Sequence, residues 1–123
     1  MPKLAELNAL DGAEFTRLVG PVFEHSPWIA ARTAAQRPFA SREALHAALI
    51  ATVAKASDEE KLSLIRAHPD LIGDAHLTAA SQAEQKSAGL QDANAEEQKQ
   101  FREYNRQYRE RFGFPFVICA RLN

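Results

Sequence analysis

The chain has 123 residues, of which 46% are hydrophobic and 25% are charged, a composition typical of a single globular domain. Fifteen basic residues against sixteen acidic ones give a net charge of −1, so neither nucleic acid nor an anionic membrane surface is an expected partner. No apolar run has the length of a membrane span, and the N-terminus lacks the basic-then-apolar order of a signal peptide. We therefore expect a cytoplasmic protein.

Two helices are predicted in the first 40 residues. The first has apolar side chains at the i, i+3, i+4, i+7, i+8 spacing of one buried helix face: Phe15, Leu18, Val19, Val22 and Phe23. Ser26 followed by Pro27 has the pattern of an N-cap and a first-turn proline, which predicts a second, short helix that Pro38 ends.

Two more helices are predicted before residue 69. Ser41 caps the first of them, and its apolar face also holds one polar residue, Thr52: Leu45, Ala48, Leu49, Thr52 and Val53. Ser57 or Asp58 caps the next one. Because the residue before a proline is disfavoured in the helical region, this helix should end at or just before His68, which precedes Pro69.

The second half of the chain predicts a short helix and a long one. Residues 77–90 form the short helix, with Ser81 as its cap and Gly89 as its terminator. The long helix begins at Asn94, ends before Gly113 and presents four aromatic side chains on one face: Phe101, Tyr104, Tyr108 and Phe112. Its acidic first turn and basic last turn agree with the helix dipole, and we interpret its charges as a solvated face.

The stretch "FPFVICA" at residues 114–120 is the one segment of β-like composition. Since no other segment offers it a partner strand, we expect extended chain that covers a pocket or the core. Cys119, the only cysteine, lies within it and is expected to be a small buried hydrophobe; a lone cysteine also excludes an internal disulfide and fits a reducing compartment. The fold class is therefore all-α: a single compact helical domain of about six helices over residues 1–123.

A titratable side chain at a helix end is a candidate for chemistry. His68 would lie at a helix C-terminus, where the macrodipole favours its protonated ring and where its side chain is free to face a cleft. The alternative is that His68 only compensates the helix dipole, and the ten residues around it do not exclude this.

The segment "SQAEQ" at residues 81–85 has two interpretations. Ser-x-x-Glu ahead of a helix is the capping-box signature, in which Ser81 and Glu84 satisfy each other's backbone amides. Ser81, Glu84 and Gln85 also fall at i, i+3 and i+4, so they can share one helix face and hold an anionic ligand near the positive helix end.

Metal and nucleophile motifs are missing. The four histidines match no zinc-binding spacing, so we expect no protein-bound metal: His25, His46, His68 and His76. There is also no Gly-x-Ser-x-Gly elbow and no glycine-rich phosphate loop.

Five motifs resemble, in sequence and order, those of a known family: "GPVFEHSPWIA" at 20–30, "RPF" at 37–39, "AHPDL" at 67–71, "LTAASQAEQKSAGL" at 77–90 and "FREYNRQYRERFGFPFVICAR" at 101–121. The chain resembles the 2-oxo-4-hydroxy-4-carboxy-5-ureidoimidazoline (OHCU) decarboxylases, the enzymes of urate breakdown that yield (S)-allantoin. The resemblance implies an all-helical domain, usually a homodimer, that acts on this small molecule without a metal or an organic cofactor. Members of the family continue into a further helix, so the resemblance also implies that this chain lacks the family's C-terminal helix.

Site residues follow from the resemblance by motif position. His68 matches the family's essential histidine, and Glu84 falls in its polar substrate-holding group; we expect both to be catalytic. The implied substrate-binding residues are Pro69, Ser81, Gln85, Phe116, Val117, Ile118 and Arg121. The chemistry suits them, since a histidine transfers protons near neutrality, a glutamine offers both donor and acceptor, and an arginine binds a carboxylate or urea oxygen.

Two other functions stay open at the level of the sequence. A small helical adaptor would bind a partner helix in an exposed groove, with His68 and Glu84 only capping helices. A cofactor-free isomerase or hydrolase would act on a related ureido ring. Carbon dioxide release from the urate-oxidation product separates both from a decarboxylase.

Overall fold

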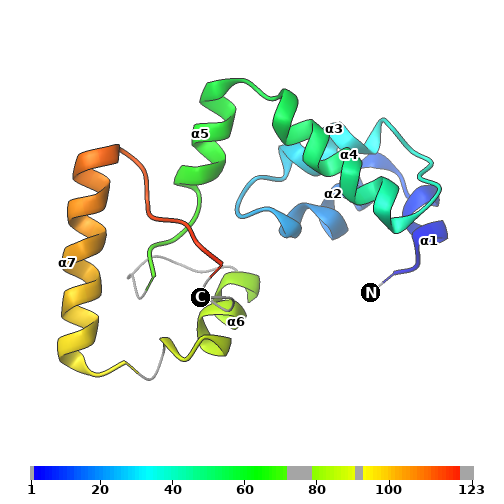
Figure 1. The fold of residues 1–123 in the computed structure, drawn as a ribbon. Coiled ribbons are helices and arrows are strands. Elements are labelled where there is room, and N and C mark those ends of the chain that lie inside the picture. Colours follow the sequence, from blue (N-terminus) through cyan, green and yellow to red (C-terminus); the bar gives the residue numbers. More distant parts are fainter. Residues whose placement is uncertain (1, 72–78, 91–92, 120–123) are drawn as a thin grey trace. The chain divides into compact units, whose positions relative to one another are not determined.

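The computed structural model describes residues 2–71, 79–90 and 93–119. Within these ranges it is helical and contains no strand, which confirms the all-α prediction (Figure 1). The elements are α1 (Leu4–Ala9), α2 (Gly12–Val19), the 3₁₀ turn η1 (Gly20–Val22), α3 (Trp28–Ala34), α4 (Arg42–Lys55), α5 (Asp58–Arg66), α6 (Ala79–Ser87) and α7 (Ala95–Phe112). The chain divides into two compact units, Met1–Lys61 and Leu62–Asn123, with the boundary inside α5.

The hydrophobic core of the first unit lies where α3 packs against α2 and α4. Phe15 of α2 and Ile29 of α3 are fully buried in it. Thr52, the polar residue on the predicted face of α4, is buried as well, and its hydroxyl lies 2.8 Å from that of Thr33 on α3. Each hydroxyl also lies within 2.9 Å of a carbonyl of its own helix, and the two hydroxyl protons are shared among these three contacts, so neither buried polar group lacks a partner.

The predicted helix over residues 15–23 ends earlier than its apolar stripe suggested. The α-helix stops at Val19 and continues as the short turn η1, and the side chain of Val22 is 64% exposed. Pro21 explains the change, because a proline lacks the amide hydrogen and its ring clashes with the preceding helical turn. Ser26 is likewise not the cap of α3: Pro27 occupies that position, and the buried Ser26 hydroxyl donates to the carbonyl of Glu24.

The "RPF" motif stabilises the first unit. Arg37 donates to the carbonyls of Leu7, Leu10 and Ala34, and its guanidinium lies over the ring of Phe15. Phe39 is buried, and its backbone exchanges two hydrogen bonds with the side chain of Asn8 (2.9 and 3.0 Å). The motif thus joins α1 to the core.

Two predicted caps in this unit are confirmed. The amide of Ala44 donates to Ser41 Oγ at the start of α4. At α5 the choice between two candidates falls on Ser57, which forms a capping box with Glu60. Hydrogen bonds from Arg32 and Ser57 lower the pKa of the Glu60 carboxyl to about 2.

Helix α7 is capped as predicted but does not bury its aromatic face. The amide of Glu97 donates to Asn94 Oδ1, and Gly113 ends the helix at φ 77°, a left-handed conformation that suits glycine. Tyr104 is 67% exposed and Phe112 is 47% exposed, so the stripe is not a core face. None of the helices in the described part of the chain is long and apolar enough to cross a membrane.

Candidate active site

His68 lies two residues beyond the end of α5. The helix stops at Arg66 and Pro69 follows, so the predicted helix end is confirmed. The ring Nδ1 of His68 lies 2.8 Å from the carbonyl oxygen of Leu64 in the last turn of α5. Because a carbonyl oxygen only accepts hydrogen bonds, Nδ1 must bear the proton, which leaves Nε2 for proton transfer.

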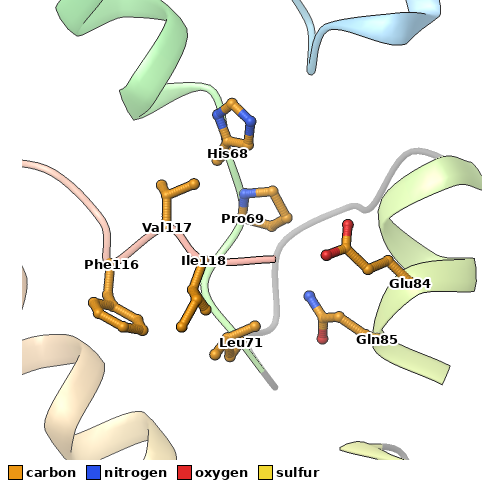
Figure 2. A pocket seen from close by; sticks show the side chains of 8 residues that line it. All are labelled: His68, Pro69, Leu71, Glu84, Gln85, Phe116, Val117 and Ile118. Atoms are coloured by element: carbon orange, nitrogen blue, oxygen red, sulfur yellow. The ribbon is translucent and has the colours of Figure 1, made fainter. Parts of the chain in front are cut away.

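Glu84 and Gln85 lie on α6, which begins at Ala79. Ser81 is therefore inside the helix rather than at its N-cap, and the capping interpretation of this position is wrong. Figure 2 shows the side chains of Glu84 and Gln85 extending from α6 toward the segment 68–71. Gln85 is buried, and its Nε2 donates to the carbonyl of Asp70 at 3.4 Å.

One pocket brings together side chains from three separate segments (Figure 2). It contains about 360 Å³ of empty space, open solvent at its mouth included. Seven of the predicted site residues line it together with Leu71: His68, Pro69, Glu84, Gln85, Phe116, Val117 and Ile118. The tail segment 114–119 has no helix or strand and lines this pocket, as its composition predicted.

The remaining predicted positions either differ from the structure or lie outside its described residues. Arg121 and His76 lie outside the described residues, and of Ser81 only the place in the helix is described. Cys119 is exposed, so the prediction of a buried thiol is wrong: the tail lies along the pocket wall instead of entering a core. Leu71 was missed, although it ends the "AHPDL" motif, because an apolar residue at a motif edge bears no chemical signal.

The polar side chains of the pocket differ in their hydrogen bonding. Glu84 Oε1 is buried and has no hydrogen-bond partner among the described residues. A buried carboxylate oxygen without a donor is costly, so Glu84 Oε1 is a candidate hydrogen-bond acceptor for a ligand. Among the described residues no three His, Cys, Asp or Glu side chains come together as metal ligands.

The OHCU decarboxylase family model matches residues 8–123. The chain belongs to the OHCU decarboxylase family. It is 44% identical over 118 residues to the OHCU decarboxylase of Haloferax volcanii, a match that covers 96% of this chain and 70% of that protein. It is 41% identical over 121 residues to the uric acid degradation bifunctional protein of a Bacillus species, with 98% of this chain and 24% of that protein covered.

A solved structure has a similar fold. The crystal structure of an (S)-allantoin synthase matches with a TM-score of 0.65 at 29% identity, over 96% of this chain and 38% of that chain. The family match includes residues from both units of the chain, and the segment "AHPDL" within it supplies three of the pocket residues: His68, Pro69 and Leu71.

Proposed function

We propose that the protein decarboxylates OHCU to (S)-allantoin and carbon dioxide in urate breakdown. The observation that supports it best is the convergence of His68, Glu84 and Gln85 on one pocket in a chain of this family. The relatives named above act, by their names, on this substrate or in uric acid degradation. Within the described part of the chain, Glu84 Oε1 is a buried acceptor without a hydrogen-bond donor, which suits the binding of a small polar molecule. The docking of a partner helix by an adaptor does not require such an atom.

The substrate itself contains the electron sink that the reaction needs. Its carboxylate and a hydroxyl share one ring carbon, and the next ring carbon bears the ureido group and a C=N bond. When carbon dioxide leaves, the bonding pair forms a C=C bond and the C=N pair moves onto the nitrogen, which is then protonated. The hydroxyl proton is lost as the carbonyl forms, and the ureido-bearing carbon gains a proton. Because this sink is within the substrate, we expect no metal or organic cofactor.

His68 is the proposed proton-transfer residue. With Nδ1 donating to the Leu64 carbonyl, Nε2 is the one ring nitrogen that can exchange protons with a substrate. The same nitrogen can accept the hydroxyl proton and deliver a proton to carbon. The bond at Nδ1 persists in both protonation states, so the ring keeps its orientation while its charge changes.

Glu84 and Gln85 are the proposed orienting residues. The free Oε1 of Glu84 accepts a hydrogen bond from the substrate hydroxyl or ureido group. Gln85 supplies an amide for the donors and acceptors of the ring, and the apolar wall formed by Phe116, Val117 and Ile118 limits the access of water. By motif position, Ser81 and Arg121 are further substrate ligands.

The direct test supplies freshly generated urate-oxidation product to the protein. Carbon dioxide release and the growth of an allantoin circular dichroism signal are expected, both faster than in the uncatalysed reaction. An unchanged rate of carbon dioxide release would refute the decarboxylase. Consumption of the substrate without carbon dioxide would instead favour an isomerase or hydrolase.

The product should be almost entirely one enantiomer. The intermediate left by decarboxylation is planar at the carbon to be protonated, so in free solution both hands would form equally. A donor fixed on one face needs only about 2.7 kcal/mol between the two deliveries to give roughly a 100 to 1 preference. In deuterated water, product sampled early should hold deuterium at that carbon in a single enantiomer. Racemic product from the first turnovers would mean that His68 is not a positioned donor.

The proposal includes two further properties, the oligomeric state and the location in the cell. We infer a homodimer from the family resemblance, which sedimentation analysis of the purified protein would test. We infer a cytoplasmic location from the lone cysteine, which fits a reducing compartment. Fractionation of cells that express the protein would test it.

A further inference from the structure

The segment 68–71 bears the proposed proton donor but belongs to no helix or strand. Such a segment lacks the repeated backbone hydrogen bonds that fix a helix, and Pro69 has no amide hydrogen to contribute. Catalytic side chains on irregular chain must therefore be held by other groups, because a displacement of about 1 Å can cost a hundredfold in rate.

Helix α7 supplies two of these groups. Asn105 Nδ2 donates to the carbonyl oxygen of Leu71 at 2.8 Å. One turn later, Arg109 Nε lies 3.2 and 3.3 Å from the two carboxylate oxygens of Asp70. Positions 105 and 109 are four residues apart, so both side chains project from the same face of α7. This face of α7 therefore holds Asp70 and Leu71, the last two residues of segment 68–71.

The same contacts reach the other polar residue of the pocket. The carbonyl of Asp70 accepts from Gln85 on α6, while the carboxylate of Asp70 accepts from Arg109 on α7. Asp70 thus connects two helices across the segment. Tyr108, between the two α7 residues, packs edge-on against Phe116 of the pocket wall at 5.4 Å between ring centroids.

We propose that Asn105 and Arg109 are positioning residues of the active site, which hold segment 68–71 so that His68 meets the substrate in a reactive geometry. The proposal rests on the proposed function and names residues outside the pocket lining. The side chains of Arg109 and Asp70 are 45% and 23% exposed. Since ion pairs this exposed add little to stability, the pair acts mainly through geometry.

The test replaces each residue by alanine. Asn105→Ala and Arg109→Ala should each lower kcat by about ten- to a hundredfold, with KM changed by less than about threefold. Helical circular dichroism should be retained, and rates are expressed per folded molecule. In ¹⁵N relaxation, the backbone amides of His68, Asp70 and Leu71 should lose order in both variants.

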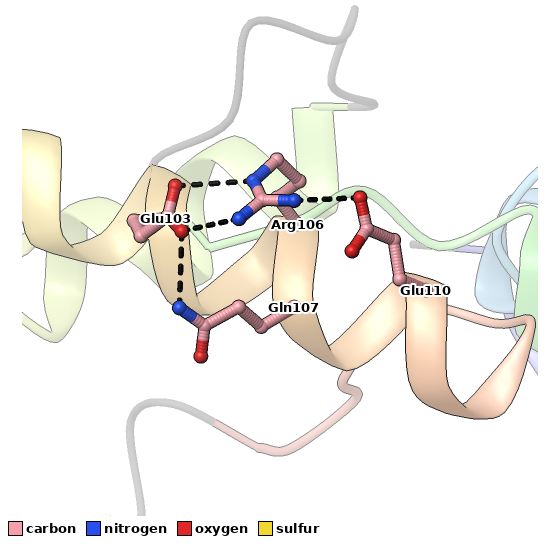
Figure 3. A network of polar contacts seen from close by, with 4 residues as sticks. All are labelled: Glu103, Arg106, Gln107 and Glu110. Atoms are coloured by element: carbon pink, nitrogen blue, oxygen red, sulfur yellow. Dashed lines mark hydrogen bonds and ion pairs between the residues drawn. The ribbon is translucent and has the colours of Figure 1, made fainter.

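Gln107 and Arg106, on the same helix, are matched control positions (Figure 3). Gln107 donates its amide to Glu103, and Arg106 pairs with Glu103 and Glu110, so both side chains are satisfied within α7. The hydrogen bonds from Arg106 and Gln107 lower the pKa of the Glu103 carboxyl to about 2. Gln107→Ala and Arg106→Ala remove the same kinds of side chain but should leave kcat and the order of segment 68–71 unchanged.

The outcomes are distinct. Equal kcat in the test and control variants, or unchanged order in segment 68–71, would overturn the positioning proposal. A fall in melting temperature with a normal rate per folded molecule would overturn it too, because it assigns the two residues to stability alone. If the unsubstituted protein releases no carbon dioxide, the proposed function fails, and the relaxation measurement still decides whether α7 orders the segment.

Discussion

His68→Gln should lower kcat by about a hundred- to ten-thousandfold, the range that a positioned proton-transfer group contributes. Glutamine can still donate a hydrogen bond toward the Leu64 carbonyl that now accepts from Nδ1. It has no group that accepts and releases a proton near neutral pH, so only the chemistry is removed. The helical circular dichroism signal and the melting temperature should stay close to those of the unsubstituted protein. Stopped-flow detection of carbon dioxide measures the rate.

His46→Gln is the matched control, because His46 is an exposed histidine on α4 and does not line the pocket. It should leave turnover unchanged. Retention of most activity by His68→Gln would contradict the proton-transfer role. Loss of the folded state would instead support the alternative that His68 mainly compensates the end of α5.

The helix ends were the most predictable part of the fold, where a single local interaction decides them. Ser41 and Asn94 cap their helices, and Gly113 adopts the left-handed conformation that ends α7. Pro69 limits α5 through sterics alone. Prediction failed where a local rule competed with another, as at Pro21, which stops the α-helix of an otherwise continuous apolar stripe.

The burial of side chains was less predictable, because it depends on what packs against a helix face. The aromatic stripe of α7 has helical spacing, yet Tyr104 is exposed and Tyr108 contacts Phe116 of the tail. Periodicity shows that such a face is apolar but does not name its contact. The contacts of the charged residues on α7 were equally hard to predict. Arg109 has the sequence pattern of a solvated residue, but it is paired with Asp70, 39 positions earlier.

The residues that line the pocket were recognised because family motifs marked them. Neither His68 nor Glu84 has a local sequence feature that excludes a capping role. The start of α6 at Ala79 removes the capping box, and the presence of both side chains in one pocket favours a role in binding or catalysis. Asn105 had no such signal, because an asparagine within a polar helix is common. Its hydrogen bond to Leu71 joins positions 34 residues apart and becomes visible only in three dimensions.

Glu84→Gln should lower activity without lowering stability. The substitution keeps the volume of the side chain but removes a negative charge whose Oε1 is buried without a donor. A neutral amide costs less to bury than a carboxylate, so the free energy of unfolding should stay constant or rise by up to about 1 kcal/mol. The rate per folded molecule should fall by about ten- to a hundredfold, because the carboxylate no longer orients the substrate. Urea denaturation and carbon dioxide release measure the two quantities.

A lower rate without a loss of stability makes this variant a sharper test than a simple loss of activity, since damage to the fold lowers both quantities together. Glu110→Gln is the control: the Glu110 carboxylate is 65% exposed and pairs with Arg106 at the surface. It should leave the rate unchanged and alter the free energy of unfolding by less than about 0.5 kcal/mol. An unchanged rate in Glu84→Gln at equal folded fraction would remove Glu84 from the substrate contacts. A large loss of stability would mean that its carboxylate is satisfied in the folded protein, and that the free oxygen is not a site kept open for the substrate.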